Sequence, residues 1–146
     1  MKLDFKSVSL SLIEYVCIIF ILISGDIFPL SIVNIIILVL SLSFGFWYLW
    51  TVKFKRFNLT INYPKNARIV PVGPYKYVRH PVFLTILLIT GVVVLEHYSL
   101  GRISVWLLLL AVLHIKIMHE ERIISHRNTD YLIYKRSTKM LIPFLY

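Results

Sequence analysis

A basic loop of this chain turns into an apolar helix over the stretch Gly73-Pro74-Tyr75-Lys76-Tyr77-Val78-Arg79-His80-Pro81. Glycine and proline are typical of a turn, and proline is also favoured in the first turn of a helix. Arg79 and His80 therefore stand at the start of a helix, where backbone N–H groups lack helical partners and the helix dipole is positive. Such a position suits a carboxylate or a phosphate at the edge of a bilayer.

Apolar runs lie on either side of this stretch, at about residues 8–24, 29–50, 81–97 and 103–118. Each is close to the ~20 residues that cross the hydrocarbon core of a bilayer. Short turns join the first run to the second and the third to the fourth. The sequence therefore predicts an all-α integral membrane fold with four transmembrane helices as two hairpins. We expect an ordered loop over 51–80, and two short helices over 118–137 with a bend near Asn128, because asparagine tolerates the left-handed conformation.

The charge distribution predicts the orientation in the membrane. The net charge is +9 and 58% of the 146 residues are hydrophobic. A soluble protein of this charge would suggest a nucleic-acid partner. Here the lysine and arginine residues are concentrated in residues 51–80, which contain no aspartate or glutamate, and after residue 118. The positive-inside rule then places this loop and both termini in the cytoplasm. We expect a multi-pass protein whose partner is the lipid bilayer, with no nucleic acid.

A second polar cluster, Lys116-Ile117-Met118-His119-Glu120-Glu121, closes the fourth apolar run. By topology it returns to the cytoplasmic level of Arg79 and His80. Lys116 and Glu120 are four residues apart and share a helix face. The alternative interpretation is a snorkelling lysine in a surface ion pair, which contributes at most about 1 kcal/mol. Glu14 lies inside the first run, where an acid is either functional or snorkels to the boundary.

Metal binding is not expected. Cys17 is the only cysteine, and the chain contains neither a Cys-x-x-Cys nor a His-Glu-x-x-His pattern. These are the spacings that hold structural and catalytic zinc.

The two clusters together resemble the isoprenylcysteine carboxyl methyltransferase family, which is related to the membrane phospholipid methyltransferases. The matching residues are Gly73-Pro74-Tyr75, Arg79-His80-Pro81-Val82-Phe83, Glu120-Glu121, Tyr131-Leu132-Ile133-Tyr134 and Pro143-Phe144. The resemblance covers about residues 60–146. It implies one membrane domain over 1–146, with an N-terminal hairpin over 1–50 and a methyltransferase-like core over 51–146 that holds the cofactor.

The implied cofactor is S-adenosyl-L-methionine, bound at the cytoplasmic edge without a Rossmann fold. The resemblance assigns catalytic roles to Arg79, His80 and Glu120, and substrate binding to Lys116. The implied acceptor is lipophilic, first the carboxylate of a prenylated cysteine; a phospholipid amine, a small thiol or a lipophilic phenol are alternatives. The implied cofactor contacts are Ala67, Arg68, Ile69, Val70, Tyr75, His80, Pro81, Val82, Phe83 and Glu120.

Several positions depart from the family pattern. Phe83 replaces a tyrosine, and Thr85 replaces a glycine. Lys116 replaces an arginine, and this change removes bidentate carboxylate recognition. Asn128 stands near a usual Phe-Gly pair. These departures keep a second hypothesis open, a non-enzymatic membrane protein on the same scaffold. A third hypothesis is a small transporter subunit with Glu14, His114 and Lys116 along its pathway.

Overall fold

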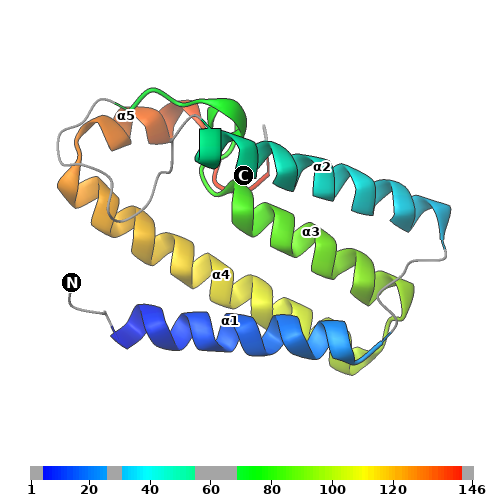
Figure 1. Cartoon of the computed structure of the whole chain (residues 1–146). Coiled ribbons are helices and arrows are strands. Elements are labelled where there is room, and N and C mark those ends of the chain that lie inside the picture. Colours follow the sequence, from blue (N-terminus) through cyan, green and yellow to red (C-terminus); the bar gives the residue numbers. More distant parts are fainter. Residues whose placement is uncertain (1–4, 26–30, 55–68, 143–146) are drawn as a thin grey trace. The chain divides into compact units, whose positions relative to one another are not determined.

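The structure, a computed structural model, describes residues 5–25, 31–54 and 69–142. These residues form α1 (Phe5–Ile23), α2 (Ile32–Phe54), the 3-10 helix η1 (Gly73–Lys76), α3 (Pro81–Glu96), α4 (Leu100–Arg127) and α5 (Asp130–Ser137) (Figure 1). Across the described ranges there is no strand, only one isolated parallel bridge between Val78 and Lys139. The predicted all-α fold is confirmed for this part of the chain.

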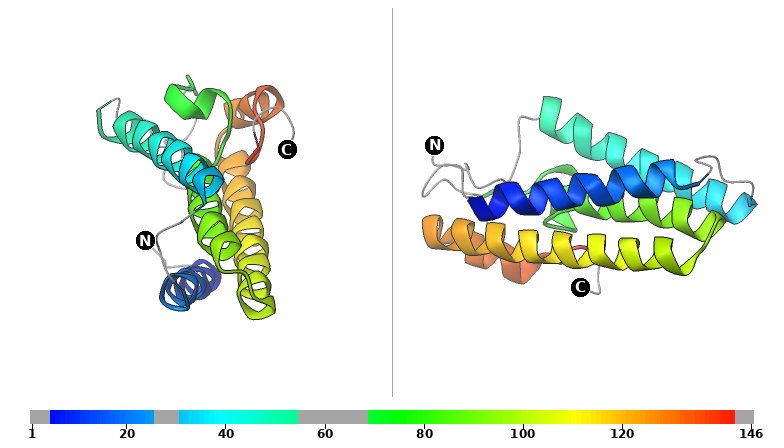
Figure 2. Two further views of the ribbon diagram at one scale, coloured as in Figure 1. Left: turned by 90° about the vertical axis from the view of Figure 1, so that its right-hand side faces the viewer. Right: turned by 90° about the horizontal axis from the view of Figure 1, so that it is seen from below.

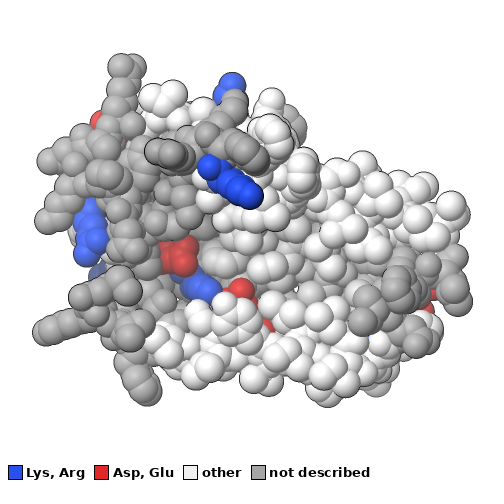
Figure 3. All heavy atoms as spheres, in the orientation of Figure 1, with Lys and Arg blue, Asp and Glu red and all other residues white. Residues whose placement is uncertain are grey.

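Two of the helices are long and apolar enough to cross a membrane, over Ile32–Lys53 and Leu100–Arg127. The apolar helices Val8–Ile23 and Pro81–Glu96 are shorter. Many large apolar side chains on these helices are exposed, and the helical surface in view is mostly uncharged (Figure 3). Two of the four expected spans are therefore candidate spans in the structure, and the other two stay a prediction.

α4 is longer than the sequence predicted, because it continues without interruption from Leu100 to Arg127. The first of the two short helices expected after residue 118 therefore forms the last turns of α4. Ile117, Glu121 and Ile124 are buried at helical spacing, which favours one continuous helix here. The predicted break at Asn128 is present: its side-chain oxygen accepts a hydrogen bond from the N–H of Asp130 at 2.9 Å, as in an Asx turn.

The chain divides into two compact units, one of residues 1–41 and 86–116 and the other of residues 42–85 and 117–146. In the first unit α1 runs alongside α4 (Figure 2). Arg102 donates to the carbonyl of Ile21 near the last turn of α1, at 3.1 Å. Glu96 accepts from the side chain of Asn34 in the first turn of α2, at 2.7 Å. Each charge therefore lies at the helix end whose dipole it complements.

The second unit has a core of Tyr75, Ile124, Tyr131 and Tyr134. The hydroxyl of Tyr134 donates to the backbone carbonyl of Tyr75 at 2.8 Å, which ties η1 to α5. Tyr48 also packs here, with its ring 6.2 Å from that of Tyr75. Tyr48 lies near the end of α2, where Trp47 and Trp50 are its neighbours in the sequence. The two tryptophans are exposed, whereas Tyr48 helps to hold η1.

Candidate functional site

The segment before α3 is held by the C-terminal part of the chain. The N–H of Arg79 donates to the carbonyl of Lys139 at 2.8 Å, and that of His80 to the carbonyl of Met140 at 3.2 Å. In return, the N–H of Lys139 donates to the carbonyl of Tyr77 at 3.2 Å. Two of the backbone donors that the sequence offered to an anion at the start of α3 are thus bound within the protein.

Arg79 is buried, and its guanidinium faces inward. Its Nε donates to Oε1 of Glu121 at 2.6 Å. Its Nη1 donates to the carbonyl of Lys135 at 3.1 Å and to that of Thr138. The sequence predicted Arg79 as a group that binds a ligand directly. In the structure it joins α4 to the end of α5.

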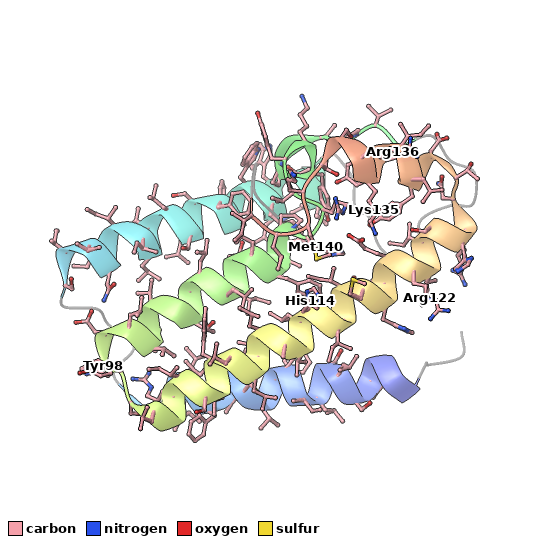
Figure 4. All side chains as sticks on the ribbon, turned by 180° about the vertical axis from the view of Figure 1, so that it is seen from behind. Tyr98, His114, Arg122, Lys135, Arg136 and Met140 are labelled. Atoms are coloured by element: carbon pink, nitrogen blue, oxygen red, sulfur yellow. The ribbon has the colours of Figure 1, made fainter. Side chains whose placement is uncertain are left out.

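Glu121 is the centre of this polar cluster, with 2% of its surface exposed. Besides Arg79, its carboxylate lies 3.4 Å from Nε2 of His80 and 2.7 Å from Nζ of Lys135. Figure 4 shows Lys135 on the side of α5 that faces α4. The sequence indicates Glu121 as part of the Glu120-Glu121 motif and as one candidate proton acceptor for an amine substrate, but it does not predict this buried cluster. Its spacing from Ile117 and Ile124 was the available signal, because it places Glu121 on the same helix face as two apolar residues.

His80 lies between two carboxylates. Its Nε2 faces Glu121, and its Nδ1 is 3.9 Å from Oε2 of Glu120. Phe83, one turn into α3, stacks on the imidazole with ring centroids 5.7 Å apart and planes 13° apart. The side chain of Glu120 keeps 20% of its surface exposed, against 6% for His80. Three predicted site residues, His80, Phe83 and Glu120, are therefore neighbours in the second unit.

The two buried tyrosines of α5 stay neutral. Burial raises the pKa of Tyr131, and the negative charge of Glu121 raises it further. Burial also raises the pKa of Tyr134, although its hydrogen bond with Thr138 acts in the opposite direction. Both phenols therefore keep their protons and remain donors at physiological pH.

A hollow of about 370 Å³ lies between the segment before η1 and α5. Its lining residues are Ile69, Pro71, Asp130, Ile133, Tyr134 and Ser137. Ile69 was among the predicted cofactor contacts, and its neighbour Val70 is exposed. The other two residues of that predicted stretch, Ala67 and Arg68, lie outside the described residues. The hollow is large enough for a small-molecule ligand.

Lys116 belongs to the first unit, where its ammonium lies 2.6 Å from Oε2 of Glu14. Glu14 is 4% exposed. This burial does not agree with the snorkelling interpretation of Glu14, and a functional role for Glu14 stays a prediction. Among the described residues, no group of three or more His, Cys, Asp or Glu side chains could hold a metal ion.

Comparison with known proteins identifies the family. The family model for isoprenylcysteine carboxyl methyltransferase (ICMT) matches residues 32–126. This chain belongs to the ICMT family. The matched range contains the cluster of His80, Phe83, Glu120 and Glu121, and it ends before α5. Neither curated proteins nor solved structures give a match to the chain. Membership of the ICMT family implies a membrane-associated methyltransferase.

Proposed function

We propose that this ICMT-family protein is an integral membrane methyltransferase that uses S-adenosyl-L-methionine. The proposed acceptor is lipophilic, first the carboxylate of a prenylated cysteine. The observation that carries the proposal is the meeting of His80, Phe83 and Glu120 beside one another, within the range that matches the family. His80 precedes α3, Phe83 lies in α3 and Glu120 lies in α4, so their proximity is a property of the fold.

The chemistry of these residues fits the cofactor. When bound, S-adenosyl-L-methionine supplies a methyl group on a positively charged sulfonium, and it also carries an amine and a carboxylate. The carboxylate of Glu120, which is partly exposed, can bind an amine or ribose hydroxyls. The faces of Tyr75 and Phe83 can attract a cation or pack against adenine. His80, Pro81 and Val82 would complete the site, together with Ile69 and Val70 from the segment before η1.

For Arg79 we propose an indirect role. Its Nε and Nη1 already bind Glu121 and two backbone carbonyls. These contacts favour a residue that shapes the site over one that touches the reacting atoms. Lys116 remains a predicted acceptor-binding residue by resemblance.

A carboxylate acceptor requires little acid–base chemistry from the protein, because the attacking oxygen is already anionic. The residues of the site then need to align oxygen, methyl and sulfur and to exclude water. An amine acceptor would instead need a group that takes a proton. His80 is the candidate we favour for that role, because the carboxylate of Glu121 is already bound by three side chains.

The test is calorimetric binding of S-adenosylhomocysteine to detergent-purified protein. We expect binding by the wild type and its loss in Glu120→Ala and His80→Ala. Arg136→Ala is the matched control, because this side chain of α5 is exposed. Normal binding by both site variants would show that the cofactor lies elsewhere. No binding to well-folded wild type would favour the non-enzymatic scaffold.

A positive result is followed by acceptor assays with a labelled methyl donor. A prenylated cysteine is compared with its methyl ester and with a phospholipid amine in the same detergent. Transfer to the free carboxylate alone supports the proposed acceptor. Transfer to the amine alone would make the protein a phospholipid-type methyltransferase, with His80 as the proton acceptor to test next.

A further inference from the structure

Three segments of the second unit meet at one buried carboxylate. Glu121 of α4 lies 2.6 Å from Arg79 and 3.4 Å from His80, both in the segment before α3, and 2.7 Å from Lys135 of α5. A buried carboxylate is costly unless it is paired and hydrogen-bonded. Here Oε1 accepts a hydrogen bond from Arg79 and lies 3.4 Å from Nε2 of His80, and Oε2 lies 2.7 Å from Nζ of Lys135.

The contact with His80 has a chemical consequence. An ionised carboxylate can only accept hydrogen bonds, so it favours the tautomer in which the imidazole nitrogen that faces it carries the proton. That nitrogen is Nε2, and the other nitrogen, Nδ1, is turned toward Glu120. The partner of one ring nitrogen thereby determines what the other can offer to a ligand. Phe83, stacked on the ring, restricts its tilt.

The contact of Glu121 with Arg79 also connects Glu121 to the residues at the end of α5 and just after it. The guanidinium that binds Glu121 also donates to the carbonyls of Lys135 and Thr138. The backbone of Lys139 then pairs with that of Val78 and Arg79, directly before His80. Glu121 is thus bound both to His80 itself and to the residues that hold the backbone of His80.

We propose that Glu121 is a positioning residue of the methyl-transfer site, which fixes the orientation and the protonated nitrogen of His80. This inference rests on the proposed function for the purpose of the site, but the hold of Glu121 on His80 is independent of it. The two adjacent carboxylates then have different roles. Glu121 is buried and holds the ring, while Glu120 is partly exposed and faces the ligand.

The first readout is the ¹⁵N NMR signal of His80 in detergent-solubilised protein labelled at histidine, assigned by its absence in His80→Ala. In the wild type we expect a signal typical of a ring protonated at Nε2. Glu121→Gln keeps the size of the side chain but removes its charge, and it should change this signal. Glu121→Asp, which keeps the charge but withdraws it by one methylene, serves if the first variant does not fold.

The second readout is the Kd for S-adenosylhomocysteine, which we expect to weaken about tenfold in Glu121→Gln, the usual effect of losing a hydrogen bond to a charged group. Lys135→Met is the matched control. It removes one partner of the same carboxylate while leaving Arg79 and His80 in place, so the His80 signal should stay unchanged.

The outcomes separate the two claims. If the wild type binds S-adenosylhomocysteine and Glu121→Gln changes neither the His80 signal nor the Kd, Glu121 is not a positioning residue. If Glu121→Gln changes the His80 signal but the folded wild type binds no S-adenosylhomocysteine, the hold on His80 stands and the proposed function fails. If Lys135→Met changes the signal as strongly as Glu121→Gln, the ring responds to the attachment of α5 and the direct role of Glu121 is overturned.

Discussion

Glu120 and Glu121 are neighbours in the chain, yet their side chains meet different surroundings. Successive residues of a helix point about 100° apart. Glu121 consequently falls on the buried face of α4 with Ile117 and Ile124, whereas Glu120 keeps part of its surface exposed. Two identical side chains thus acquire different chemistry from one step along a helix. For these two residues, the direction in which the side chain points matters as much as its chemical identity.

Gly73 is a residue for which only glycine fits. Its φ is +59°, a conformation that side chains rarely adopt, and an added Cβ would lie against the hydroxyl of Thr51. We expect Gly73→Ala to destabilise the protein by at least the ~1–2 kcal/mol of a left-handed non-glycine residue, with weaker cofactor binding because η1 carries Tyr75. Thermal unfolding in detergent measures the first effect and calorimetry the second.

Two comparisons make this prediction specific. Adding Thr51→Ala to Gly73→Ala removes the steric clash and should restore part of the lost stability, but not the part due to φ. Gly101→Ala is the control, because its nearest atom is at 4.0 Å, the side-chain oxygen of Ser99. A Gly73→Ala protein as stable as the Gly101→Ala protein would contradict the assigned backbone conformation.

At the scale of the element, α1 is attached to α4 by polar contacts near its middle and at its end. Glu14 pairs with Lys116, and Arg102 binds the carbonyl of Ile21. The rest of the α1 contact is a narrow buried stripe that includes Cys17 and Ile21. α1 also lies outside the range that matches the family. Among the described residues, these few contacts therefore hold α1 in the first unit.

Breaking the Glu14–Lys116 pair should destabilise the first unit. Removing one partner takes from a largely buried charge the counter-ion that lies 2.6 Å away, and breaking a buried pair in this way costs about 3–5 kcal/mol. Because Lys116 keeps 15% of its side chain exposed, we expect Glu14→Leu and Lys116→Met each to fall at the lower end of that range. The double variant should recover most of the loss, because neither charge remains.

The measurement is a double-mutant cycle of thermal or denaturant unfolding in one detergent. Single variants as stable as the wild type would show that the pair contributes nothing. Additive losses in the double variant would show that the two side chains act independently.

At the scale of the whole molecule, the membrane topology is the main open prediction. Four spans with both termini in the cytoplasm would place Ser24 and Tyr98 on one side of the bilayer and Lys53 and Arg136 on the other. Single cysteines at these positions, in a Cys17→Ser background, can be labelled with a membrane-impermeant maleimide in oriented vesicles. Cys17 is 3% exposed, so the maleimide should hardly reach it in the wild type. Its replacement should therefore change the labelling pattern little.

We expect the cysteines replacing Ser24 and Tyr98 to react from the non-cytoplasmic side only. Those replacing Lys53 and Arg136 should react from the cytoplasmic side only. Labelling of the Ser24 and Lys53 positions from the same side would mean that α2 does not span. Labelling of the Tyr98 and Arg136 positions from the same side would exclude a span by α4.

The sequence alone determined the features that depend on local or periodic patterns. The apolar runs predicted α1 to α4 because apolar composition and length are properties of consecutive residues. Asn128 predicted the break before α5 because asparagine tolerates the left-handed conformation, whereas the structure shows an Asx turn there. The spaced motifs from Gly73 to Glu121 indicated the family because their order survives in the linear chain.

Only the tertiary structure decided which charged groups meet. The inward turn of Arg79 toward Glu121 joins residues 42 positions apart, and the pairing of Lys116 with Glu14 joins residues 102 positions apart. The sequence suggested only a partner one helical turn from Lys116, Glu120, because that spacing is visible in consecutive residues. The contact with Glu14 forms when the helices assemble, and it is therefore absent from any single stretch of the chain.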